Sequence, residues 1–239
     1  MKLLILQHVR AEHPGIFRSF LYEDGHEWVS VQLDEGETPP SLAGFDGLWV
    51  MGGPMDVWEV DSYPWLRDEK RLIREAVAEI GMPFLGLCLG HQLLAEALGG
   101  TCGKAEQPEI GVMPVQLTEV GTDDIIFDDF PDKFSCLQWH AAEIKQMPRG
   151  AVCLATSPDC AVQAMAWGPR AYSTQFHLEA EPDTVQSWMS IPTYRTSLIK
   201  ALGETGPKKL ELAFDAHITE FNRSAKIFYL NWCQKVKRT

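Results

Sequence analysis

The sequence predicts an α/β protein whose open, mostly parallel sheet carries helices on both faces. In the first half of the chain, short apolar runs alternate with amphipathic stretches, as they do in repeated βαβ units. One of these runs, Phe84–Cys88, is apolar throughout, which is typical of a strand that is buried on both faces. In the second half, short apolar runs follow one another with turn residues between them and little room for helices. That change predicts antiparallel additions and hairpins around the last parallel strand.

The first half is expected to contain four strands and three helices. The expected strands are Lys2–His8, Glu27–Leu33, Gly47–Met51 and Phe84–Cys88. The expected helices are Phe17–Glu23, Leu66–Ile80 and Leu89–Leu98. The longest helix is indicated by Leu66, Ile73, Val77 and Ile80, which recur at helical spacing, and by Gly81, which ends it.

The second half is expected to contain short strands and then only helices. The expected strands are Val112–Val120, Phe134–Trp139, Ala151–Thr156, Val162–Trp167 and Ala171–His177. From Asp183 onward the chain is expected to be helical, with a break near residues 203–207. The apolar stripe of the last helix is expected to contain Leu212, His217 or Phe214, Phe221, Ala225, Phe228 and Trp232. Such a stripe packs on the rest of the domain or serves as a surface for a partner.

Length and charge limit the classes of function. The chain has 239 residues, which fits one domain with additions better than two full domains. We expect a core over about 1–184 and a helical extension over about 185–239. Thirty-three acidic residues against 21 basic ones give a net charge of -12. This balance disfavours binding to nucleic acids or to anionic membranes, because phosphate groups require a basic face.

Signals of export, membrane insertion and metal binding are missing from the sequence. Only four apolar residues follow Lys2, too few for a signal peptide, and no apolar run approaches about 18 residues. The six cysteines form no CxxC pair and show no zinc-ligand spacing. We therefore expect a cytoplasmic protein with reduced thiols, no membrane segment, no metal and no cofactor.

The segment around Cys88 has the pattern of a nucleophile elbow. Cys88 lies between an apolar strand and an apolar helix, with Gly86 two residues before it and Gly90 two residues after it. A nucleophile on a sharp, strained turn crowds these positions, so only very small residues fit there. The turn also places the sulfur at a helix N-terminus, where the helix dipole would lower the pKa of the thiol. The plainer alternative is a buried cysteine in a glycine-bounded turn.

Two further segments could complete a site with Cys88. His177 follows an apolar strand and could act as the base for the thiol, while Glu179 could fix the tautomer of the imidazole. Gly52-Gly53 ends the third strand, so its N–H groups could form an oxyanion hole with the N–H of Leu89. Taken singly, the His–x–Glu segment is also compatible with a surface pair or a helix start, and the glycine pair with a simple turn.

Three motifs in register resemble those of the class I, triad-type glutamine amidotransferases. The motifs are Gly52-Gly53-Pro54, Gly86–Gln92 and Gln175–Glu179, and the resemblance extends over about residues 40–182. It implies a flavodoxin-like sheet. It also implies that Cys88 attacks the side-chain amide of glutamine and that His177 acts as acid and base, with Glu179 orienting it.

The resemblance also implies a set of substrate-binding residues. The amides of Gly53 and Leu89 would hold the oxyanion, and Gln92 would help to bind the substrate. Trp139 and His140 match the strand end at which the family's backbone groups meet the α-carboxylate and α-amine of the amino acid.

Two positions depart from the family pattern. Leu178 stands between the histidine and the glutamate, where the family usually has proline. After His140 the chain continues Ala141-Ala142-Glu143, where the family commonly has glycine and then aspartate. The first departure affects the geometry of the His177 segment, and the second affects the glutamine pocket.

The expected function is hydrolysis of the γ-amide of glutamine through a γ-glutamyl thioester on Cys88, with release of glutamate and ammonia. A hydrolase of γ-glutamyl amides or peptides would use the same residues, and a non-enzymatic binding module that uses the C-terminal helix is a third possibility. The sequence contains no phosphate-loop pattern and no length for an ATP-dependent synthetase. The candidate protein partners are therefore a second copy of the chain and a separate synthetase subunit.

Overall fold

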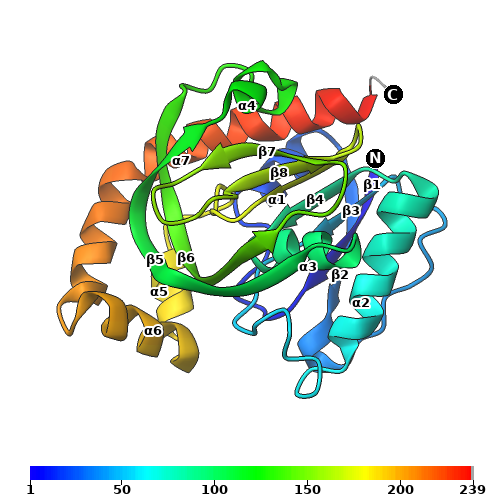
Figure 1. Ribbon diagram of the computed structural model, residues 1–239. Helices are drawn as coiled ribbons and strands as arrows, with labels where there is room; N and C mark the ends of the chain where they lie inside the picture. Colours follow the sequence, from blue (N-terminus) through cyan, green and yellow to red (C-terminus); the bar gives the residue numbers. More distant parts are fainter. Residues whose placement is uncertain (238–239) are drawn as a thin grey trace.

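A mixed nine-stranded sheet forms the centre of the computed structural model, which describes residues 1–237 (Figure 1). The parallel strands are β2 (Glu27–Gln32), β1 (Lys2–Gln7), β3 (Gly47–Val50), β4 (Phe84–Leu87) and β9 (Ala171–Thr174), in that order across the sheet. The antiparallel strands that follow are β8 (Ala164–Trp167), β7 (Ala151–Thr156), β5 (Thr101–Leu117) and β6 (Lys133–Gln146). The predicted parallel sheet with antiparallel additions after the last parallel strand is thus confirmed.

Helices cover both faces of the parallel half, because the buried side chains of its strands alternate between two apolar clusters. Leu3 and Ile5 of β1 pack on the side of α1 (Phe17–Glu23) and α7 (Gly206–Lys237). Leu4 and Leu6 pack on the opposite side, with α2 (Trp65–Arg74) and α3 (Leu89–Ala97). Figure 1 shows α2 and α3 in front of the sheet and α7 behind it.

Several elements differ from their expected bounds. Strand β5 begins well before the expected Val112–Val120 and ends at Leu117, since Val120 lies in a helix, and β6 extends past both ends of the expected Phe134–Trp139. The two strands pair with each other over most of their length. The extra part of β5 is mostly polar and exposed, so its sequence carries no apolar alternation. The helix expected over 66–80 continues past α2 as a π-helical turn, Glu75–Ile80, and ends as expected at Gly81. Short helices not predicted are α4 (Glu119–Asp123) and the 3₁₀ turns Leu33–Glu35 and Ile125–Phe127.

The C-terminal part of the chain is helical, as expected, and has its break at Gly203. It consists of α5 (Thr184–Met189), α6 (Pro192–Leu202) and α7. The α7 stripe was wrongly expected to include Leu212, whose side chain is 60% exposed. Leu210 is buried instead, since it lies one turn before Phe214 on the same side of the helix. Near the end of α7, Trp232 packs edge-on against Trp49 of β3, with ring centroids 5.3 Å apart.

Within residues 1–237, none of the helices is both long and apolar enough to span a membrane.

Candidate active site

Cys88 lies on a strained turn between β4 and α3, at the carboxyl end of the parallel sheet. Its backbone has φ 50° and ψ -101°, a conformation that non-glycine residues rarely adopt. The flanking glycines are needed for close packing. A Cβ on Gly86 would lie 2.5 Å from the carbonyl oxygen of Gly90, and one on Gly90 would lie 2.1 Å from that of Val50. The strained backbone and the tight glycine contacts are the geometry of a nucleophile elbow, although Cys88 is also a buried cysteine in a glycine-bounded turn.

His177 and Glu179 follow β9, the neighbour of β4, and lie beside Cys88. Nδ1 of His177 donates to Oε1 of Glu179 at 2.7 Å, so in the neutral imidazole Nε2 is free to accept a proton. Burial opposes a charge on His177, but Glu179 and Cys88 together raise its pKa well above the ordinary range. Trp188 of α5 supports the ring edge-on, with centroids 4.5 Å apart. This arrangement suits a base that takes up a proton and later returns it.

The Cys88 thiol is more buried than the sequence suggested. Only 5% of the residue is exposed, and this burial raises the pKa of the thiol, although His177 nearby lowers it again. The expectation of a lowered thiol pKa is therefore wrong, because burial raises the pKa of this thiol. Nε2 of Gln175 donates to the sulfur at 3.5 Å. A resting thiol that passes its proton to His177 on attack fits these surroundings.

The predicted oxyanion groups meet beside Cys88. Within the described residues, the N–H groups of Gly53 and Leu89 donate to no backbone carbonyl or side chain, so both can serve a ligand. A Cβ on Gly53 would lie 2.8 Å from a methyl carbon of Leu89, which shows how closely the two segments approach. One on Gly52 would lie 1.7 Å from Oε2 of Glu12, so a side chain at this position would displace the Glu12 carboxylate.

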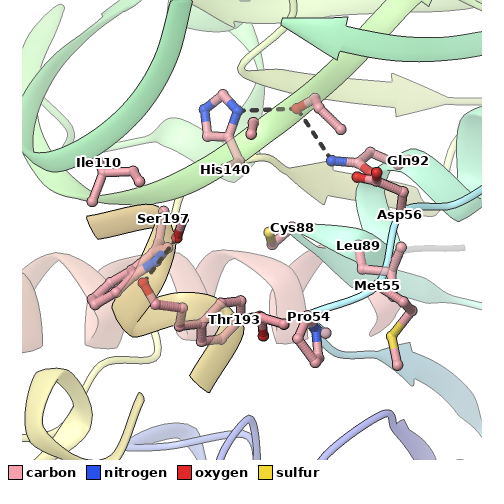
Figure 2. A pocket seen from close by; sticks show the side chains of 15 residues that line it. Pro54, Met55, Asp56, Cys88, Leu89, Gln92, Ile110, His140, Thr193 and Ser197 are labelled. Atoms are coloured by element: carbon pink, nitrogen blue, oxygen red, sulfur yellow. Dashed lines mark hydrogen bonds between the residues drawn. The ribbon is translucent and has the colours of Figure 1, made fainter. Parts of the chain in front are cut away.

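A pocket of about 130 Å³ opens above Cys88, comparable in size with a cavity that holds one benzene-sized group. Besides Cys88, five predicted residues line it: Gly53, Leu89, Gln92, Trp139 and His140. Gly52, His177 and Glu179 lie behind this lining. Figure 2 shows the Cys88 sulfur facing the pocket between Leu89 on one side and Thr193 and Ser197 on the other.

Two of the walls that line the pocket differ in origin. We call Gly53, Cys88 and Leu89 the elbow wall, since they belong to the ends of β3 and β4 and to the start of α3. The helical wall consists of Thr193, Tyr194 and Ser197, all on α6. The helical wall could not be predicted from the sequence, because these residues belong to no recognisable motif.

Glu12 is another residue of the site that the sequence does not reveal. It is 2% exposed, and Oε1 accepts a hydrogen bond from the hydroxyl of Tyr194. Burial raises its pKa from 4.5 to about 7, and His177 is the main group that opposes the rise. A glutamate in a polar loop after the first strand gives no signal of this burial, since Tyr194 lies 182 residues further along the chain.

Gln92 and His140 are both held in place by hydrogen bonds to the carbonyl of Ala142 in β6, and each has one further partner. Nε2 of Gln92 donates to the carbonyl of Ala142 at 3.3 Å and to Oε1 of Gln175 at 3.1 Å. Nδ1 of His140 donates to the same Ala142 carbonyl at 3.0 Å. Behind the pocket, Nε2 of His140 lies 3.0 Å from Oε2 of Glu109. These contacts fix the pocket wall formed by β6.

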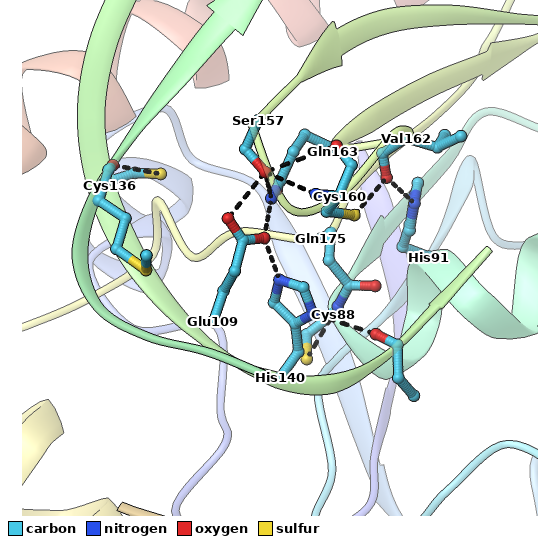
Figure 3. A network of polar contacts seen from close by, with 12 residues as sticks. Cys88, His91, Glu109, Cys136, His140, Ser157, Cys160, Val162, Gln163 and Gln175 are labelled. Carbon is cyan, nitrogen blue, oxygen red and sulfur yellow. Dashed lines mark hydrogen bonds and ion pairs between the residues drawn. The ribbon is translucent and has the colours of Figure 1, made fainter. Parts of the chain in front are cut away.

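Glu109, His140 and Cys160 are the group of described residues whose ligand atoms come close enough to hold a metal ion, all within 4.8 Å of one another. The Glu109 carboxylate, however, already accepts hydrogen bonds from Ser157 at 2.7 Å and from Gln163 at 2.6 Å (Figure 3). Burial also raises the pKa of the Cys160 thiol to about 12, which disfavours a thiolate ligand. The cluster is therefore better described as a hydrogen-bond network that supports His140.

Comparison with known proteins connects this geometry to one family. The family model for glutamine amidotransferase class-I matches residues 19–189. The glutamine amidotransferase-like protein YfeJ of Salmonella typhimurium is 31% identical over 191 residues, which cover 78% of this chain and 79% of YfeJ. A glutamine-hydrolyzing GMP synthase subunit of Archaeoglobus fulgidus is 31% identical over 162 residues, which cover 63% of this chain and 81% of that relative.

Solved structures show the same architecture over almost the whole chain. A glutamine amidotransferase from Thermotoga maritima superposes with a TM-score of 0.86 at 27% identity, covering 99% of this chain and 98% of its own. One from Methylobacillus flagellatus gives 0.85 at 28% identity, covering 98% and 94%. The likeness thus includes the helical C-terminal part, which extends beyond the family match.

Proposed function

The chain belongs to the class-I glutamine amidotransferase family, and on that basis we propose that it hydrolyses the γ-amide of glutamine through a thioester on Cys88. The observation that carries the proposal is the position of the Cys88 sulfur. It lies on a strained elbow, faces a pocket with two free N–H groups and has a Glu179-oriented imidazole beside it. The names of the GMP synthase relatives, which include glutamine hydrolysis, support the same reaction.

The acylation step begins when the sulfur of Cys88 attacks the side-chain carbonyl carbon of glutamine. His177 takes the thiol proton, and the carbonyl π electrons move to oxygen, which is held by the N–H groups of Gly53 and Leu89. When the C–N bond breaks, His177 gives its proton to the departing nitrogen, so ammonia leaves as a neutral molecule. Glu179 stabilises the imidazolium that exists between the two transfers.

The deacylation step repeats this chemistry with water. Water gives a proton to His177 and attacks the thioester carbonyl, and the same two N–H groups hold the second oxyanion. Collapse of this intermediate breaks the C–S bond, the proton returns from His177 to the Cys88 sulfur, and glutamate leaves. Removing one oxyanion donor from such a site costs about 2.7–4 kcal/mol of transition-state stabilisation.

A γ-glutamyl amine or peptide is the second candidate substrate, and one observation favours it. Asp56 lies at the edge of the pocket on the β3 side and is partly buried. A carboxylate there would attract a leaving group that carries a second amine. Because the attacked bond is identical, Cys88, His177 and the two oxyanion donors would keep their roles.

We also propose that the ammonia passes to an acceptor site on another protein. The relative from Archaeoglobus fulgidus is named as one subunit of a GMP synthase, so an association of this kind has a counterpart among similar chains. A purely binding role has less support, because it would require neither the strained Cys88 turn nor the His177–Glu179 pair.

The deciding experiment offers the purified protein glutamine and a panel of γ-glutamyl amines and dipeptides, and measures the release of glutamate and ammonia. Release of both from glutamine would support the main proposal. Release of glutamate from γ-glutamyl amines alone would favour the second candidate. Absence of glutamate from every substrate, with Cys88 resistant to alkylation, would contradict an enzymatic role.

A further inference from the structure

His8 is a completely buried histidine at the carboxyl end of β1, next to the segment that ends β3. It does not line the pocket, and the sequence shows it only as a lone histidine after a strand. A Cβ on Gly53 would lie 2.8 Å from the Cβ of His8 and 2.8 Å from a methyl carbon of Leu89. His8 and the start of α3 therefore both pack closely against Gly53.

Both ring nitrogens of His8 face acceptors. Nδ1 lies 2.7 Å from the carbonyl oxygen of Gly52, and Nε2 lies 2.9 Å from Oε1 of Glu69 on α2. Because a carbonyl and a carboxylate can only accept, two good hydrogen bonds require a proton on each nitrogen. Trp65 stacks on the ring, with centroids 5.6 Å apart and planes at 19°, a contact that favours a cation. Burial opposes this charge, but Glu69 and the Gly52 carbonyl outweigh it and raise the pKa of His8.

The bond to Gly52 has a geometric consequence for Gly53. The carbonyl of Gly52 and the N–H of Gly53 belong to one peptide unit, which is planar and trans. In such a unit the two groups point in opposite directions, so the carbonyl fixes the direction of the N–H. The chain would otherwise be free to rotate here, since both residues are glycines.

We propose that the His8–Glu69 pair positions the oxyanion hole: it anchors the Gly52 carbonyl and thereby aims the Gly53 N–H at the oxygen of the tetrahedral intermediate. This inference rests on the proposed function. His8 is a positioning residue, since it touches neither the substrate nor the Cys88 sulfur. It is expected to affect the transition state, in which the oxyanion forms, more than the binding of the substrate.

The test compares two replacements of His8 in a Glu69→Gln background, so that no carboxylate is left buried without a partner. His8→Asn keeps a side-chain N–H close to the position of Nδ1, whereas His8→Leu removes the donor at similar volume. For the double variant with leucine we expect kcat to fall about 10- to 100-fold with KM within about threefold, a smaller loss than removal of an oxyanion donor. The double variant with asparagine should recover most of kcat.

A second measurement separates positioning from general damage. Alkylation of Cys88 by iodoacetamide requires the sulfur and His177 but forms no oxyanion. The alkylation rate should therefore stay within about twofold of wild type in both double variants. Thermal unfolding of each variant shows whether its fold is intact.

Equal kcat values for the leucine and asparagine variants would overturn the inference. A parallel loss of kcat and alkylation rate would also overturn it, because that result indicates a displaced Cys88. If the wild type released no glutamate from any substrate, the proposed function would fail, and this inference with it. Full activity of wild type and leucine variant together would overturn only the role of His8.

Discussion

The elbow wall and the helical wall face each other across one pocket, but the sequence specifies them in different ways. The elbow wall depends on contacts between residues close in sequence, such as Gly86 with Gly90, so a short pattern reveals it. The helical wall depends on packing between distant segments, for example between Trp139 of β6 and Tyr194 of α6, with ring centroids 5.7 Å apart. The family match ends at residue 189, before α6 begins.

This difference suggests a division of labour between the walls. The elbow wall holds the reacting sulfur and the free N–H groups, so its substitutions should act mainly on kcat. On the helical wall, the hydroxyls of Tyr194 and Ser197 donate to protein groups and that of Thr193 makes no hydrogen bond with the described residues, so substitution of Thr193 should act mainly on KM. Substitutions on each wall test this assignment of kcat effects to the elbow wall and KM effects to the helical wall.

The largest effect is expected for Cys88→Ala, which removes the proposed nucleophile in the elbow wall. Glutamate release should fall at least about 10⁴-fold, because the covalent route is lost. Circular dichroism and thermal unfolding should show an intact fold. The control is Cys153→Ala, which removes a half-buried thiol of β7 and should keep wild-type turnover. Substantial glutamate release by the Cys88 variant would show that another group acts as nucleophile.

The next largest effect is expected for Glu179→Gln. The amide can present an N–H to Nδ1 of His177, which favours the tautomer with its proton on the wrong nitrogen. We expect kcat to fall about 10³- to 10⁴-fold with KM little changed. Glu181→Gln is a matched control two residues away, since Glu181 forms an ion pair with Arg18 at 2.8 Å outside the pocket. Similar losses in both variants would argue against a specific role for Glu179.

The parallel strands and the elbow could be predicted from the sequence because their patterns are local. Phe84–Cys88 is apolar throughout, and Gly86 is required by a steric contact with Gly90 within that turn. Gly90 itself is required by the close approach of Val50 in β3, but it belongs to the same short pattern. The β5–β6 ribbon was underestimated, because a mostly polar, exposed strand shows no alternation. His8 and Glu12 were not found because their partners are distant: Glu69 lies 61 residues from His8, and Tyr194 lies 182 from Glu12.

The packing of the C-terminal helices also bears on whether the chain forms one domain. We propose that the chain forms one domain rather than a core with a separable extension. The contact of Trp232 with Trp49 supports this, since it places the end of α7 against the central sheet. Truncation before α7 is accordingly expected to unfold the protein, because it would expose the apolar face of that sheet.

Glu12 lies next to both walls, and its raised pKa predicts that the stability of the fold depends on pH. It contacts Tyr194 on the helical wall and closely approaches Gly52 behind the elbow wall. Burial raises its pKa from 4.5 to about 7, so the folded protein holds this proton more tightly than the unfolded chain does. The contribution of protonated Glu12 to the stability of the fold is therefore complete below about pH 4.5 and is lost as the pH rises through about 7.

Glu12→Gln should remove this pH dependence, because the amide stays neutral. Relative to wild type, the free energy of unfolding of the variant should increase by about 3 kcal/mol between pH 4.5 and pH 8. Denaturant unfolding at these two pH values measures the change. If the free energies of unfolding of the variant and of the wild type change equally between the two pH values, Glu12 titrates in its ordinary range and does not connect the walls as a neutral acid.

The smallest effect is expected on the helical wall, for Thr193→Val. The Thr193 side chain lines the pocket, and its hydroxyl makes no hydrogen bond with the described residues, so it is available to a substrate. Losing one such bond costs about 0.5–1.5 kcal/mol, which corresponds to a KM increase of about 2- to 13-fold. Thr196→Val is the matched control on α6, since its hydroxyl donates to the Pro192 carbonyl at 2.8 Å and points away from the pocket lining. An unchanged kcat with a raised KM for Thr193→Val alone would support the division of labour, whereas a loss of kcat would assign the helical wall a part in the chemistry.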